Sequence, residues 1–180
     1  ELIWTRDNGF QPLRWCGASR VPPALLAAAP HLRPIRIEAD ALGPNSPEAP
    51  LLVSPQHRIL VRSAVAARMF GCTEVLAAAK HLTQLPGVQV DEELEGFCYH
   101  HLMLDRHEVI LSNGAESESL YPGPEALKAL PEAALEEIET LFPGLVLGAD
   151  LPPPARLLAR GTQVRRLAER HAANRRPLVS

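Results

Sequence analysis

The sequence has few aromatic residues, few cysteines and no excess of charge of either sign. Aromatic side chains make up 4% of its 180 residues, and the basic residues are not interleaved with them, as they are in proteins that stack on nucleic-acid bases. The chain has 18 Lys and Arg against 21 Asp and Glu. Overall charge therefore gives no reason to expect a nucleic acid or an anionic membrane as a partner.

Long apolar runs are also missing. The longest one covers residues 24–29, whereas a helix that spans a bilayer needs about 20 apolar residues. Residues 1–7 lack the basic start and the apolar stretch of a signal peptide. We therefore expect no membrane insertion. The residues themselves leave targeting and oligomeric state open.

Three cysteines, Cys16, Cys72 and Cys98, are an odd number and form no Cys-x-x-Cys motif. Their simplest interpretation is as buried apolar thiols, with a disulfide or a reactive thiol as alternatives. The sequence has no glycine-rich phosphate loop, no Gly-x-Ser-x-Gly elbow and no paired-carboxylate motif. No cofactor is therefore expected.

Eighteen prolines, clustered in connecting segments, predict short strands and fixed loops in the first two thirds of the chain. Residues 2–6 and 11–15 flank Asp7-Asn8-Gly9, and Asn-Gly is a strong hairpin signal because both residues tolerate positive φ. A second Asn-Gly pair, Asn113-Gly114, predicts another turn. Further strands are expected at 34–37, 51–53, 59–61, 98–104 and 108–111, and residues 75–81 fit either a strand or a helical turn.

Beyond residue 121 the pattern becomes helical. Apolar residues recur at helical spacing after Pro124, and Pro131 should split the segment into two helices. After a stiff Pro152-Pro153-Pro154 connector, a last helix is expected over about 155–173. Residues 124–150 contain six acidic residues, and residues 155–180 contain seven arginines. These charges could be solvated, attract each other or form a partner surface.

Two segments carry a family resemblance. Residues 51–61 contain Ser54-x-x-His57 between two apolar runs, and residues 99–114 run from Tyr99 through His107 and an apolar strand to the second Asn-Gly turn. In this order, after a hairpin, they resemble motifs of the Hint domains of hedgehog proteins and inteins. They are most similar to a bacterial branch found in secreted, often repeat-rich calcium-binding proteins.

The resemblance implies a mainly β, antiparallel Hint-like fold over residues 1–121, with a helical C-terminal extension over 122–180. It implies self-cleavage by an N–S acyl shift, with the protein's own upstream polypeptide as the substrate, and an extracellular setting. By resemblance, His57 is the acid for the departing nitrogen and Ser54 orients it. Residues of the late motif, His107 and Asp105, assist the second stage.

Chemistry agrees with these roles. Breaking an amide needs a thiolate, a stabilised oxyanion and an acid for the departing nitrogen, and the pKa of histidine lies near neutrality. Asp105 and His107 are two residues apart, so they share one face if the backbone is extended there. Asp105 could orient an imidazole, or it could be a turn residue between two strands.

Two departures from the family pattern limit the activity. The leading catalytic cysteine is expected well upstream of the first hairpin, and none of the three cysteines present can replace it, so the chain alone is expected to be inert. Splicing needs a His-Asn pair after the late turn, where this chain has Glu118-Ser119. Asparagine cyclisation, and with it splicing, is therefore excluded.

Two rival interpretations stay open. One is a metal site built from His57, His107, Asp105 and one of His100 and His101, because histidine and carboxylate ligands suit zinc. Adjacent His100 and His101 would point to opposite faces of a strand, so at most one of them could join. The other rival is a non-catalytic β-rich binding or capping module.

Overall fold

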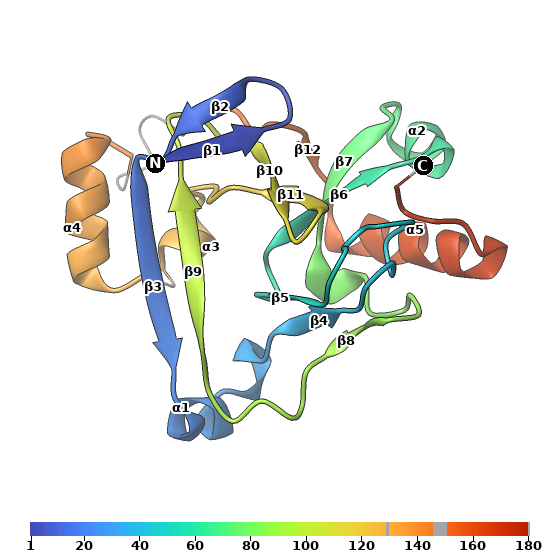
Figure 1. Ribbon diagram of the computed structural model, residues 1–180, viewed down its shortest axis with the longest axis horizontal. Coiled ribbons are helices and arrows are strands. Elements are labelled where there is room, and N and C mark those ends of the chain that lie inside the picture. Colours follow the sequence, from blue (N-terminus) through green and yellow to red (C-terminus); the bar gives the residue numbers. More distant parts are fainter. Residues whose placement is uncertain (129, 146–150, 180) are drawn as a thin grey trace.

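Short strands joined by tight turns build most of the molecule, as a computed structural model shows (Figure 1). The structure describes residues 1–128, 130–145 and 151–179. Most strand pairs are antiparallel, and the longest helix lies near the C-terminus. The predicted mainly β fold with a helical C-terminal part is therefore confirmed. Within the described residues, no helix is long and apolar enough to cross a membrane.

The strands are β1 (Leu2–Thr5), β2 (Gly9–Pro12), β3 (Trp15–Val21), β4 (Ile35–Ile37), β5 (Leu51–Val53), β6 (Arg58–Arg62), β7 (Glu74–Ala78), β8 (Val88–Val90), β9 (Phe97–Met103), β10 (Val109–Ser112), β11 (Ala115–Glu118) and β12 (Leu157–Leu158). The helices are α1 (Pro23–Ala28), α2 (Ala64–Phe70), α3 (Pro124–Leu127), α4 (Glu132–Leu141) and α5 (Gly161–Asn174), with 3-10 turns η1 (Pro30–Leu32) and η2 (Ala79–His81).

These strands form three sheets. The largest has the order β12-β7-β6-β11-β10-β1-β2, and its only parallel pair among the described strands is β12 with β7. A second sheet has the order β5-β4-β8, and β3 pairs with β9 as a long two-stranded ribbon (Figure 1). Segments far apart in the sequence therefore meet in every sheet.

Both Asn-Gly signals mark turns, but of different kinds. Asn113 and Gly114 both have positive φ, 48° and 79°, and form the expected two-residue turn between β10 and β11. In the first hairpin Thr5 pairs with Gly9, so the loop has three residues, 6–8. None of these has positive φ, whereas Gly9, the first residue of β2, does. The first turn was thus expected in the right place with the wrong geometry.

The main core lies where the β4 and β6–β7 regions meet α5. Fully enclosed side chains there include Ile37, Ile59, Val75 and Leu167. A second apolar cluster packs Trp15 and Met103 of the ribbon against Ile138 of α4. Gly17 makes room for the Trp15 indole, because a Cβ at residue 17 would lie 2.1 Å from that ring. The chain after residue 121 therefore contributes to both clusters.

The C-terminal part is only partly as predicted. The break at Pro131 is confirmed, because α3 ends before it and α4 begins after it. The expected helix over 155–173 is wrong at its start, since Leu157 and Leu158 extend the large sheet by pairing with Val75 and Leu76. The short helices α1 and α2 and the strands β3, β8 and β11 were not fully anticipated. The boundary at residue 121 stays a prediction.

Ser63 joins two helices and gives a first testable expectation. Its Oγ accepts a hydrogen bond from the Ala66 amide at the start of α2, and it donates to Nε2 of buried His171 in α5 at 3.0 Å. Ser63→Ala removes the helix cap and the partner of His171 Nε2, while His171 Nδ1 keeps its contact with the Arg176 carbonyl. We therefore expect the free energy of unfolding to fall by about 2 kcal/mol. Urea unfolding at pH 7 measures this. Thr140→Ala, on the exposed side of α4, should change it by less than about 0.5 kcal/mol.

Candidate functional site

His57 sits in a tight turn between β5 and β6. The backbone N–H of His57 is shared between the Ser54 hydroxyl, at 3.2 Å, and the Ser54 carbonyl, at 3.0 Å. The first residue of η2 stabilises the turn, because the Ala79 amide donates a hydrogen bond to the His57 carbonyl at 2.9 Å. Ser54 therefore acts on the backbone that presents the imidazole and not on the ring itself.

The outer nitrogen of the His57 ring is enclosed but has no partner. His57 Nε2 is buried and forms no hydrogen bond with any described group, although the residue as a whole is only half-buried. Burial lowers the pKa of His57, and nearby Arg58 and His107 lower it further, while Glu118 opposes them. A buried polar atom without a hydrogen-bond partner costs folding free energy. This nitrogen is therefore a candidate for contact with a substrate group.

Glu118, at the end of β11, is the carboxylate that lies near both histidines. Its carboxylate accepts from the Arg58 amide at 2.9 Å and from the Arg58 guanidinium at 3.1 and 3.2 Å. Burial opposes ionisation, but the contact with His107 and the positive forms of His57 and Arg58 outweigh it, so the pKa of Glu118 is lowered. A buried carboxylate is thus held ionised next to His57.

His107 faces the other side of the same carboxylate. Its Nε2 lies 3.2 Å from Glu118 Oε2, in ion-pair range, although the angle is not that of a well-formed hydrogen bond. Its Nδ1 accepts from the Ala155 amide at 3.2 Å, and its ring packs against Tyr121 with centroids 4.8 Å apart. The structure therefore brings His57 and His107 together around Glu118, with both nitrogens of His107 facing protein groups.

Asp105 does not join this cluster. The backbone bends at residues 105 and 106, so the extended geometry that would put Asp105 and His107 on one face is absent. Asp105 is exposed and lies 3.3 Å from Arg14 Nε, whereas the His107 side chain is buried. The condition for a shared face of Asp105 and His107 is therefore not met, and the position of Asp105 is that of a turn residue.

A cavity of about 300 Å³ lies beside His107. Its lining includes Leu104, His107, Leu120, Phe142 and Pro152. Most of these side chains are apolar and belong to the late motif and the chain that follows α4.

The two neighbouring histidines of β9 separate as expected. His101 is half-buried and contacts the Ser19 hydroxyl at 3.2 Å, whereas His100 is exposed. Burial lowers the pKa of His101, and His57 lies close enough to lower it further. In residues 1–128, 130–145 and 151–179, no group of three or more histidines, cysteines or acids is arranged to hold a metal ion. The metal-site interpretation thus gains no support.

The cysteines lie away from the cluster. Cys16 and Cys98 are exposed, on the ribbon face opposite His101, and Cys72 is partly buried after α2, where its thiol donates to the Glu74 carbonyl. The expectation of buried thiols is therefore wrong for two of the three. No described contact links any of them to His57 or Glu118.

The structure places two motif histidines around a buried carboxylate in a mainly antiparallel β fold. A family model described as a Hint domain matches residues 1–124. This chain belongs to the Hint domain family. Neither the search of curated proteins nor the search of solved structures finds a match. The Hint-like fold is thus confirmed over more than two thirds of the chain.

The sequence analysis of this Hint domain identified His57 and His107 but missed Glu118, the carboxylate beside both of them. It treated Glu118 only as a departure from the splicing pattern, and it assigned no role to Arg58 or to Ala155. An acid placed where splicing members carry histidine, together with an arginine directly after the motif histidine, was the available signal. The contact from Ala155 has no such signal, because it comes from outside the matched residues.

Proposed function

We propose that this Hint domain is autoprocessing and cleaves the peptide bond that precedes a cysteine located upstream of Glu1. The substrate is the protein's own upstream polypeptide, and no splicing follows. The observation that carries the proposal is the buried, unpartnered His57 Nε2 beside the Glu118 carboxylate. Following the resemblance, we further propose that the domain acts in a secreted bacterial protein.

In the proposed reaction the cysteine thiol gives its proton to His57 as the sulfur attacks the preceding carbonyl carbon. Burial lowers the pKa of His57, so the resting ring is neutral and can accept that proton. The C–N bond then breaks, and His57 passes the proton to the departing nitrogen, leaving a thioester and a free amine. Water or a thiol attacks the thioester and restores the cysteine.

Glu118 supports this proton transfer electrostatically. Its carboxylate favours the positive form of His57, which at neutral pH develops during the reaction. Because Arg58 already fixes the carboxylate, little reorganisation is needed when that charge develops. His107 has both nitrogens engaged with protein groups, so we assign it to positioning Glu118 and not to contact with the substrate.

Splicing is not part of the proposal because the chain offers no asparagine at the required place. Glu118 is occupied by Arg58 and His107. The Ser119 hydroxyl is buried and accepts a hydrogen bond from the Glu108 amide at 3.0 Å. Both side chains therefore hold the fold at a position where splicing members carry out cyclisation.

Thiol-dependent release is the direct test. A precursor that carries the family's leading cysteine and a preceding segment ahead of Glu1 should cleave at the cysteine during a day at neutral pH. Dithiothreitol should accelerate release, because it intercepts the thioester. Mass spectrometry identifies the products, and the matched precursor with that cysteine replaced by alanine should stay intact. Cleavage that ignores the thiol would refute the mechanism, and an intact cysteine precursor would favour a non-catalytic module.

A further inference from the structure

A short segment beyond the family match reaches back to the candidate site. We name residues 155–158 the C-terminal strap. Its first amide, from Ala155, donates to His107 Nδ1 at 3.2 Å, and its last two residues pair with β7. The matched residues end at 124, so the strap lies outside them.

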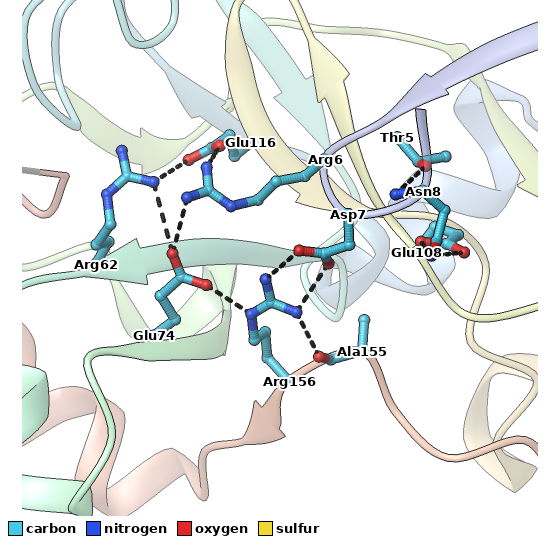
Figure 2. Close-up of polar contacts among 10 residues, drawn as sticks. All are labelled: Thr5, Arg6, Asp7, Asn8, Arg62, Glu74, Glu108, Glu116, Ala155 and Arg156. Carbon is cyan, nitrogen blue, oxygen red and sulfur yellow. Dashed lines mark hydrogen bonds and ion pairs between the residues drawn. The ribbon is translucent and has the colours of Figure 1, made fainter. Parts of the chain in front are cut away.

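Arg156 holds the strap in place. Figure 2 shows its guanidinium between two acids, with Nη1 and Nη2 donating to Asp7 at 2.9 and 2.8 Å and Nε donating to Glu74 at 2.6 Å. The same side chain donates to the Ala155 carbonyl at 2.7 Å. These hydrogen bonds with Asp7 and Glu74 raise the pKa of Arg156 above its usual value. One side chain thus ties the Ala155 peptide to the first hairpin and to β7.

The acids that receive Arg156 are themselves part of a wider network. Glu74 also pairs with Arg6 and Arg62, and these two arginines share Glu116 of β11 (Figure 2). The side chains of Glu74 and Glu116 are mostly buried, with 17% and 13% exposed. The anchor of the strap is therefore a fixed, partly desolvated network and not a loose surface pair.

The Ala155 contact has a specific chemical consequence for His107. An imidazole nitrogen that accepts a hydrogen bond carries no proton, so a neutral ring must carry its proton on the other nitrogen. With Nδ1 accepting from Ala155, that proton is on Nε2, which faces Glu118. The Glu118 carboxylate can only accept and so also favours a proton on Nε2, and the Ala155 amide strengthens this preference because it requires an unprotonated Nδ1.

We propose that the C-terminal strap is a positioning element of the site: the Ala155 amide fixes His107 as its Nε2–H tautomer toward Glu118, and Arg156 holds that amide in place. The effect of the strap on cleavage rests on the proposed function. Its effect on the tautomer does not. The strap extends the working unit beyond the matched residues 1–124.

The tautomer is tested directly on the 180-residue chain by nuclear magnetic resonance. A long-range ¹H–¹⁵N correlation spectrum should show His107 as a single Nε2–H tautomer. Ala155→Pro removes the amide proton and Arg156→Ala removes the anchor, and each should add signals of the Nδ1–H tautomer. Arg160→Ala removes an exposed arginine that follows the strap and should leave the spectrum of the ring unchanged.

Circular dichroism and urea unfolding establish whether each variant is folded, and Arg156→Ala keeps the test decisive if Ala155→Pro does not fold. A folded variant of either kind that keeps the single Nε2–H tautomer overturns the proposal. In the cleaving precursor, both variants should slow release about tenfold, the effect of roughly one hydrogen bond. If a variant changes the His107 tautomer but leaves the rate of release unchanged, the proposed role of the strap in the site is overturned. If the unmodified precursor never cleaves, the proposed function fails, while the spectra still decide whether the strap sets the tautomer.

Discussion

A precursor in which His57 is replaced by alanine is expected to cleave itself about 10²–10⁴-fold more slowly than the unmodified precursor, the usual contribution of a positioned acid–base group. The reason is that, in the proposed mechanism, the enclosed Nε2 of His57 takes the thiol proton and delivers it to the departing amine. The rate of product release at neutral pH, followed by mass spectrometry with and without dithiothreitol, measures the effect.

Two comparison variants give this experiment its meaning. Ser54→Ala removes a hydrogen bond to the backbone of His57 but leaves the ring, so we expect a loss of only about 1 kcal/mol in transition-state stabilisation. His100→Ala removes an exposed imidazole from β9 and should cleave at the unmodified rate. Full activity in His57→Ala would rule out the assigned role while leaving the fold untouched.

Glu118→Gln is expected to have the largest effect on stability. The variant keeps the size of the side chain but removes the charge that pairs with Arg58 and faces both histidines. Because the carboxylate is buried, with 7% of its side chain exposed, we expect the free energy of unfolding at pH 7 to fall by about 3 kcal/mol. Release from the cleaving precursor should also slow, since His57 loses its counter-charge.

The stability that Glu118→Gln loses should depend on pH in a defined direction. The folded protein lowers the pKa of Glu118 below its ordinary value of 4.5. A lowered acid pKa contributes stability that is fully present above the unfolded pKa and disappears as the pH falls through the folded one. The difference between the two proteins should therefore be constant above about pH 5.5, roughly one unit above the unfolded pKa. It should shrink in acid.

Urea unfolding at several pH values provides the measurement. Glu95→Gln is the matched control, because Glu95 is exposed and surface substitutions usually change stability by less than about 0.5 kcal/mol. A Glu118→Gln protein as stable as the control, or a difference that grows in acid, would contradict the assignment of Glu118 as a buried, ionised partner.

Much of the strand pattern could be predicted because it depends on neighbours in the sequence. Asn113-Gly114 forms its turn since two adjacent residues must adopt positive φ there. Pro131 separates α3 from α4 because its ring has no N–H to donate. The wrong start of the last helix shows the limit of such reasoning. Leu157 and Leu158 gain their partners from β7, which no local pattern reveals.

The candidate site shows the same division. Ser54 and His57 are local, since a hydroxyl three residues before a histidine forms the turn within one short segment. Asp105 was misplaced because its shared face with His107 depended on an extended backbone, and the chain bends there instead. Glu118 could be seen only as a difference from a family pattern, because its partner Arg58 lies 60 residues away in the sequence.

The sequence by itself determined that this chain is a mainly β Hint domain with His57 in a tight turn and His107 in a late motif, because short-range turn chemistry and the order of motifs specify both. Only the tertiary structure decided that Glu118 lies beside both histidines and that the Ala155 amide donates to the second one. The physical reason is that burial creates these interactions. A carboxylate, an imidazole and a backbone amide become selective partners only where packing of distant strands removes the water that would otherwise satisfy each of them.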